Sequence, residues 1–282
     1  MNNTDAPLAP VLVFVDRGDS GAAVRYGAAE ATRTLRPLRL VHVSPSGDRW
    51  LIRVGRDSLR LAHARAAGEV AGRVLVQSTH LCGGTRDEAV ALADSAALVV
   101  LEQLPPGNHR LPMESDAVVL ASVTDTPVVV VPTSWVERRR GVVTVGLDTQ
   151  AADDTAVRAA ITLARLRGDV LRVVVAGGAS RADADTRLER LGGDGCDLAV
   201  ELTAAPPASA LASAATSSDL LVVGRHHPRP PDHSRLGSLA RELLAAASCP
   251  VLLTAPGHVH PDSQDPRIEE GPAVPAHARR AS

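Results

Sequence analysis

The sequence predicts an α/β protein in which mostly parallel strands alternate with helices that cover both faces of a sheet. Short unbroken runs of valine and leucine recur along the chain and suit strands that are buried on both faces. Longer segments between these runs repeat their apolar residues at helical spacing. The same order of elements begins again near residue 142, so we expect two domains of this kind, each with a five-stranded sheet.

The individual elements follow from these patterns and from their boundary residues. Thr85 and Glu88 have the spacing of a helix capping box, and Pro206 and Pro207 mark a helix start. The expected strands are residues 11–15, 38–43, 73–79, 97–101, 128–131, 142–147, 171–176, 198–203, 220–223 and 251–254. The expected helices are residues 24–35, 50–72, 85–96, 113–123, 152–167, 183–191, 208–216 and 237–247.

The repeat can be tested by counting residues. Leu101 to Pro127 and Gly224 to Pro250 are both separations of 26 residues. Upstream of these segments the first copy is nine residues longer than the second, and we place this difference between the second and third strands of each copy, where a longer connection costs little. We therefore predict a disordered N-terminal segment (1–9), a first domain (10–134), a linker (135–141), a second domain (142–256) and a disordered tail (257–282).

Composition excludes several classes of function. The formal net charge is −2, from 30 basic and 32 acidic residues, which gives no electrostatic case for nucleic acid. No lysine is present, so neither a P-loop lysine nor Schiff-base chemistry is available. The three cysteines are far apart and indicate neither a disulfide framework nor a thiolate metal site. No apolar run approaches the ~18 residues that span a bilayer, and we expect a cytoplasmic protein without a membrane partner.

One stretch, residues 218–256, combines a buried strand, a loop, a helix and a second strand. Gly224 ends the first strand, and Gly237 and Ser238 open the helix, whose free N–H groups suit an anion such as phosphate. Gly224, two residues, His227, nine residues, then Gly237 and Ser238 resembles the G-x2-G-x9-G-(S/T) nucleotide-binding signature of the universal stress protein family. The run 238–253, with its Cys-Pro junction, is also similar to that family, and the resemblance covers residues 10–256.

The resemblance implies that the second domain binds ATP or another adenine nucleotide, with Mg²⁺ accompanying ATP. It places Asp148 beside the ribose and adenine and the backbone near Ala176 against the adenine. The phosphate side would be formed by Gly224, His227, Gly237, Ser238 and Leu239, and Arg225 is a candidate for adding positive charge beside a triphosphate. His227 departs from the family glycine, and Thr149 and Gln150 replace its Gly-Ser pair. The alternative for Ser238 is an ordinary helix cap.

The first domain resembles the same family but has lost the glycines of the signature. Leu101, Leu104 and Glu114 stand at the three glycine positions, whereas Asp16 and Ser115 are retained. A carboxylate at Glu114 would satisfy the helix dipole and repel a triphosphate. We therefore expect a structural first domain with a degenerate site.

Three functional hypotheses remain. The first is a stress-responsive sensor or regulator that binds ATP in the second domain, with at most slow hydrolysis, because no catalytic motif is visible. The second is a nucleotide-independent scaffold of the same fold, and the third is an enzyme acting on a small phosphorylated substrate. The loop histidines His226, His227 and His233 match no zinc pattern, so we expect no metal site. The resemblance also implies that strands 128–131 and 251–253 join the domains as an intramolecular pseudo-dimer, because members of the family commonly dimerise through their last strands, and a further homodimer stays open.

Overall fold

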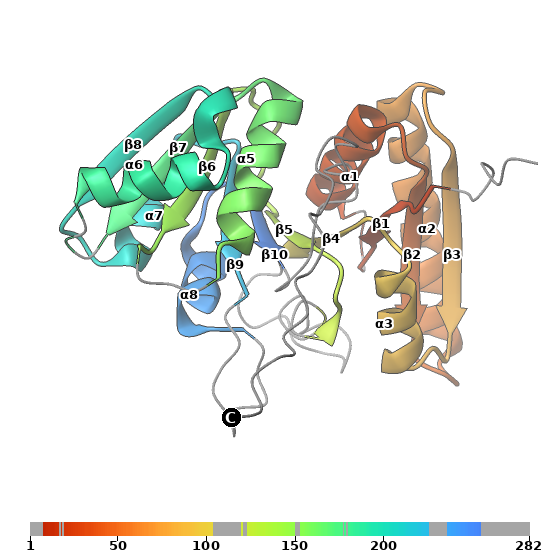
Figure 1. Cartoon of the computed structure of the whole chain (residues 1–282). Helices are drawn as coiled ribbons and strands as arrows, with labels where there is room; N and C mark the ends of the chain where they lie inside the picture. Colours follow the sequence, from red (N-terminus) through yellow and green to blue (C-terminus); the bar gives the residue numbers. More distant parts are fainter. Residues whose placement is uncertain are drawn as a thin grey trace, which may run out of the picture.

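The computed structural model describes residues 8–16, 18, 20–103, 120, 123–149, 153–176, 178, 180–225 and 236–254. They form three layers, with one ten-stranded sheet between two layers of helices (Figure 1). The strands are β1 (Val11–Phe14), β2 (Leu38–Ser44), β3 (Val76–Cys82), β4 (Leu98–Gln103), β5 (Val128–Pro132), β6 (Val142–Leu147), β7 (Val170–Ala176), β8 (Leu198–Thr203), β9 (Leu220–Gly224) and β10 (Val251–Thr254). The helices are α1 (Gly21–Thr34), α2 (Arg49–Val70), α3 (Arg86–Asp94), α5 (Thr155–Arg167), α6 (Arg181–Arg190), α7 (Pro207–Ala215) and α8 (Ser238–Ala246), with a short 3₁₀ turn at Gly193–Gly195. The predicted α/β class is confirmed.

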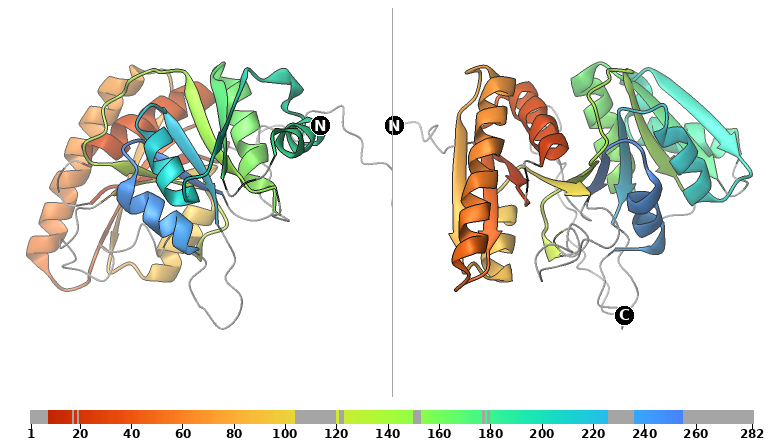
Figure 2. Two further views of the ribbon diagram at one scale, coloured as in Figure 1. Left: turned by 90° about the vertical axis from the view of Figure 1, so that its left-hand side faces the viewer. Right: turned by 180° about the vertical axis from the view of Figure 1, so that it is seen from behind.

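The strand order is β3-β2-β1-β4-β5-β10-β9-β6-β7-β8. We call β1 to β5 with their helices the N-terminal half and β6 to β10 with theirs the C-terminal half. Both halves have the same internal strand order, and their neighbouring strands are parallel. The two halves lie side by side and join where β5 and β10 pair antiparallel (Figures 1 and 2). The expected contact between these strands is confirmed, and it merges the two five-stranded sheets into one.

The hydrophobic core divides into one cluster on each face of the sheet. Helices α1, α2, α5 and α6 pack on one face, and α3, α7 and α8 pack on the other. Successive strand residues point to opposite faces, so Val11 and Val13 enter the first cluster whereas Leu12 enters the second. This double burial explains why the strands are apolar at nearly every position.

The predicted capping box at the start of α3 is present. The Thr85 hydroxyl accepts the backbone N–H of Glu88 at 3.2 Å, and the Glu88 carboxylate accepts that of Thr85 at 2.8 Å. Pro206 and Pro207 open α7 as predicted. The N-termini of α3 and α7 could be predicted from the sequence because a helix cap depends on residues that are close together in the chain.

Several predicted boundaries, among them the starts of α1 and α5, were wrong by two or three residues, and two of these errors have a visible cause. Strand β3 begins at Val76 instead of residue 73, because Arg73 closes α2 by donating to the carbonyl oxygens of Glu69 and Val70, both at 3.1 Å. Helix α6 begins at Arg181 instead of residue 183, since Ser180 is its N-cap. The longer connection of the N-terminal half coincides with α2, which has 22 residues against 10 in α6.

Some predictions fall outside the described residues. Of the helix expected at 113–123, only Leu120 and Val123 are described, and both are helical. The loop 226–235 and the expected disordered tail, 257–282, lie outside the described residues. Of the expected disordered start, 1–9, residues 8 and 9 are described. Among the helices that are described, none is long and apolar enough to cross a membrane.

Candidate functional site

A pocket of about 600 Å³ lies at the carboxyl ends of β6 and β7 in the C-terminal half. This is the edge at which open parallel sheets bind ligands. Its volume falls within the range of small-molecule sites, about 300–1,000 Å³. The lining residues are Gly146, Leu147, Asp148, Thr149, Val174, Ala176, Gly178, Ser180, Asp183, Pro207, Leu211 and Leu239.

Three of the predicted site residues meet in this pocket. Asp148 directly follows β6, Ala176 is the last residue of β7, and Leu239 is the second residue of α8. They come from separate parts of the chain, and the parallel arrangement brings them to one edge. The pocket therefore combines the strand ends predicted for the nucleoside with the first turn of the helix predicted for the phosphates.

The glycines of the signature do not line this pocket, although both lie where the sequence places them. Gly224 ends β9 beside Thr254, and among the described residues a Cβ on Gly224 would meet Ala156 at an ordinary 3.7 Å. Gly237 is the N-cap of α8, so the exposed Ser238 is its first helical residue. The alternative interpretation of Ser238 as the N-cap is wrong, because Gly237 occupies that position.

Arg225 is placed differently from its prediction. Its side chain is buried, and its guanidinium group donates to the carbonyl oxygen of Thr124 and, at 2.6 Å, to that of Thr126. Both acceptors precede β5 in the N-terminal half. Arg225 therefore bridges the two halves instead of lining the pocket, and the expectation that it contributes charge beside a triphosphate needs this correction.

The remaining predicted residues divide into two groups. Asp16 follows β1, and its backbone N–H donates to the Ser20 hydroxyl at 2.8 Å, while Leu101 is a buried residue of β4. The residues that lie outside the described part of the chain are His227, Leu104, Glu114 and Ser115. The proposed difference at the phosphate end of the two halves thus remains a prediction.

The N-terminus of α8, like that of the neighbouring helix α7, has no side-chain cap among the described residues, in contrast to several other helices. Side chains accept hydrogen bonds from the first turns of α1 (Glu102), α2 (Asp48), α3 (Thr85) and α6 (Ser180). Within the described residues, Gly237 offers no side-chain acceptor to α8, and the first turn of α8 carries no acidic residue. An anion at this end would meet uncapped N–H groups and the positive end of the helix dipole.

Sequence reasoning missed the contribution of α6 to the pocket. The Ser180 hydroxyl accepts the backbone N–H of Asp183 at 3.1 Å and donates to its carboxylate at 2.7 Å. A serine followed three residues later by an acid is a readable cap signal. Arg187 holds the adjacent loop by donating to the carbonyl oxygen of Thr149 at 2.8 Å, and it forms an ion pair with Asp154 at 2.6 Å. Two aspartates line this part of the pocket, Asp148 after β6 and Asp183 of α6, and they make it acidic.

No group of three histidine, cysteine, aspartate or glutamate side chains that could hold a metal ion occurs in the described part of the chain. The loop with His226, His227 and His233 lies outside that part.

Comparison with known proteins gives one family. Residues 175–255 match the sequence model of the Universal stress protein family. This segment, from the end of β7 through β10, is similar to the sequences of that family. A search of curated proteins found no match to the chain.

Solved structures extend the likeness to most of the fold. A universal stress protein from Archaeoglobus fulgidus DSM 4304 superposes with a TM-score of 0.66 at 13% sequence identity, covering 88% of this chain and 97% of that one. A putative universal stress protein from Pseudomonas aeruginosa UCBPP-PA14 gives a TM-score of 0.64 at 17% identity, covering 88% and 94%. At these identities the superpositions establish that the two halves together share the fold of these proteins.

Proposed function

We propose that the chain is a universal stress protein whose C-terminal half binds an adenine nucleotide, with ATP as the ligand, and acts as a stress-responsive sensor or regulator. The observation that carries the proposal is the pocket in which Asp148, Ala176 and Leu239 meet. Much of its lining lies in the segment that matches the family, and Asp148 lies upstream of that segment, directly after β6. Residues 10–134 and 142–256 are taken as the two domains, a division that the identical strand order of the two halves supports.

The charges around the pocket support one orientation of the nucleotide. Asp148 and Asp183 would repel phosphate oxygens but can accept hydrogen bonds from ribose hydroxyls or from the adenine amino group. The adenine and ribose are therefore placed against Asp148 and Ala176. The phosphates are placed towards Gly237, where the α8 N–H groups have no side-chain acceptor among the described residues. Mg²⁺ would be held chiefly by phosphate oxygens.

The test is calorimetric titration of the purified chain with ATP, before and after Gly237→Glu. A carboxylate at this helix start satisfies the dipole and opposes the phosphates, so we expect an affinity loss on the order of tenfold or more. The matched control is Gly68→Glu, because Gly68 is an exposed glycine of α2 with open space around its Cβ position. The control should bind ATP like the parent.

Each alternative function has its own outcome. If neither the parent nor the control binds ATP or ADP, the nucleotide proposal fails and a scaffold of the same fold remains. If the parent binds ATP and Gly237→Glu binds equally well, the phosphate placement is wrong. Turnover of a small phosphorylated compound that disappears in Ser238→Ala would favour the enzyme hypothesis. ATP hydrolysis, measured in the same samples by phosphate release, should be slow or undetectable.

A further inference from the structure

A second cavity, of about 260 Å³, lies at the junction of the two halves. Its lining comes from helix α1 of the N-terminal half, helix α5 of the C-terminal half and the central strands. Figure 1 shows these two helices on either side of the central strands. The floor is apolar, with Val129 of β5 and Leu252 of β10, and Ala159 and Leu163 of α5 contribute one wall. This cavity shares no lining residue with the pocket at β6 and β7.

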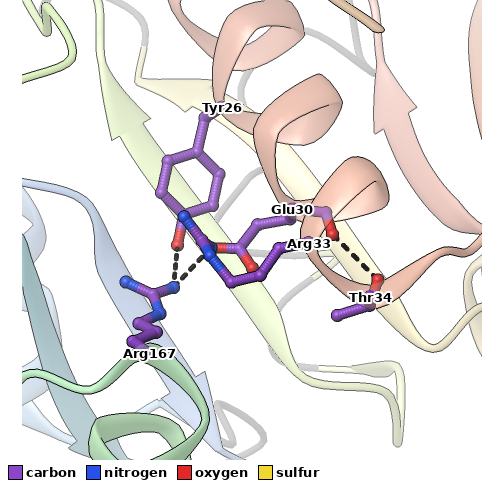
Figure 3. A network of polar contacts seen from close by, with 5 residues as sticks. All are labelled: Tyr26, Glu30, Arg33, Thr34 and Arg167. Carbon is purple, nitrogen blue, oxygen red and sulfur yellow. Dashed lines mark hydrogen bonds and ion pairs between the residues drawn. The ribbon is translucent and has the colours of Figure 1, made fainter. Parts of the chain in front are cut away.

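Charged side chains line the same cavity and connect the two helices (Figure 3). Arg167 of α5 donates to the Tyr26 hydroxyl at 3.2 Å and forms an ion pair with Glu30, both on α1. Arg33 approaches the same Glu30 carboxylate at 2.6 Å. The Arg167 and Glu30 side chains are only 8% and 6% exposed, whereas Arg33 is 38% exposed and can reach solvent. The cavity thus has an apolar floor and an arginine-rich border.

The hydrogen-bonding capacity of this border is incomplete. The Nε atom of Arg167 is buried and has no hydrogen-bond partner among the described residues. A buried donor without an acceptor is costly, because its bonds to water have been lost. Arg167 and Arg33 line the cavity beside one carboxylate, that of Glu30, and Arg36, also in the lining, donates to the carbonyl oxygen of Ala9 at 3.1 Å. Burial alone would raise the pKa of Glu30, but Arg167 and Arg33 outweigh it and lower the pKa, so Glu30 is ionised and these three side chains together carry one net positive charge.

We propose that this junction cavity binds a small carboxylic acid with an apolar body. The hydrocarbon or aromatic part would lie on the floor of β5 and β10, and the carboxylate would accept hydrogen bonds from the arginine border. A cavity of about 150 Å³ holds benzene. By proportion, 260 Å³ gives room for on the order of ten non-hydrogen atoms. Because each half supplies one wall, the ligand would bind only when the halves are joined.

The probe is octanoate, which has this size and charge, and Trp135 is the reporter. The ring of Trp135 packs edge-on against Tyr26 at 5.5 Å, next to the cavity. The other tryptophan, Trp50, is 63% exposed on α2 and can be replaced in a Trp50→Phe background. We expect a saturable change in fluorescence with octanoate and binding at least tenfold weaker for octan-1-ol, which lacks the charge. No saturable change, or equal affinity for the alcohol, would overturn the proposal.

A second experiment tests whether octanoate binds in this cavity, by filling the cavity with a larger side chain that carries no charge. Ala159→Phe places a large side chain on the α5 wall and should weaken octanoate binding at least tenfold. Ala91→Phe makes the same change at an exposed position of α3 and should bind as the parent does. If Ala159→Phe does not fold, as judged by circular dichroism, Thr34→Leu narrows the cavity from α1 and answers the same question. Undiminished binding in a folded cavity-filling variant would overturn the assignment, whatever the outcome of the ATP titrations.

Discussion

Replacing Arg167 by methionine should destabilise the protein by about 3–5 kcal/mol, the usual cost of removing one partner of a buried ion pair. The structure supplies the reason. Glu30 is 6% exposed, and Arg167 is its buried partner from the other half. Methionine keeps much of the length and the apolar stem of arginine but leaves the carboxylate with Arg33 as its charged partner among the described residues. The lower end of the range is expected, since Arg33 persists.

Arg33→Met is the matched control. Arg33 approaches the same carboxylate, but its side chain is 38% exposed, so solvent screens the pair. Such pairs contribute about 0–1 kcal/mol. A second comparison is the double variant of Arg167→Met with Glu30→Gln, which removes both charges. It should be more stable than Arg167→Met alone, because no buried carboxylate is left without its partner.

The assay is urea unfolding followed by circular dichroism, supported by thermal melting. For a protein of this size a loss of 3 kcal/mol corresponds to a decrease in Tm of roughly 6–12 °C. If Arg167→Met and Arg33→Met cost the same, burial does not determine the strength of these contacts and the reasoning fails. It also fails if the double variant is as unstable as Arg167→Met.

Three further predictions rest on single positions. The pKa of Glu30 in the folded protein lies below its ordinary value of 4.5, so its contribution to stability is present above pH 4.5 and is lost as the pH falls through the folded-state pKa. In urea unfolding at different pH values, the free energy of unfolding of Glu30→Gln should therefore depend less on pH below 4.5 than that of the parent. Gly55→Ala should destabilise by about 1–3 kcal/mol, since a Cβ there would stand 2.3 Å from an imidazole carbon of β2, whereas Gly68→Ala meets open space and should stabilise by up to ~1 kcal/mol in the same urea assay. Burial raises the pKa of the Cys249 thiol to about 12, so a thiol reagent at pH 8 should label the exposed Cys82 first and reach Cys249 only after denaturation; early labelling of Cys249 would contradict this burial.

The strands were the most predictable part of the fold. Residues 142–147 and 198–203 were predicted to the residue as β6 and β8. The β6 run is apolar and bounded by turn residues, so local sequence sufficed. The start of β3 failed because Arg73 closes the preceding helix through its side chain. The pattern of apolar residues does not show that the Arg73 side chain folds back onto the carbonyl oxygens of α2.

The site was predictable where backbone position decides and unpredictable where side-chain direction decides. Asp148 and Ala176 end neighbouring parallel strands, so topology alone brings them together. Arg225 also follows a strand end, yet its guanidinium group crosses into the other half and meets the carbonyl oxygens of Thr124 and Thr126. Only the packing of the two halves determines that direction. The sequence repeat predicts the helices and strands of each half, but it does not predict the side-chain contacts between the two halves.

The two halves also differ at the position two residues before the aspartate that follows the first strand of each half. If Asp16 corresponds to Asp148, then Phe14 corresponds to Gly146, because each lies two residues earlier. Gly146 lines the pocket, and a Cβ there would already stand 3.0 Å from Leu211. Phe14 instead packs its ring against the core on the same face of the sheet. A benzyl group therefore stands in the N-terminal half at the position where glycine lines the pocket of the C-terminal half.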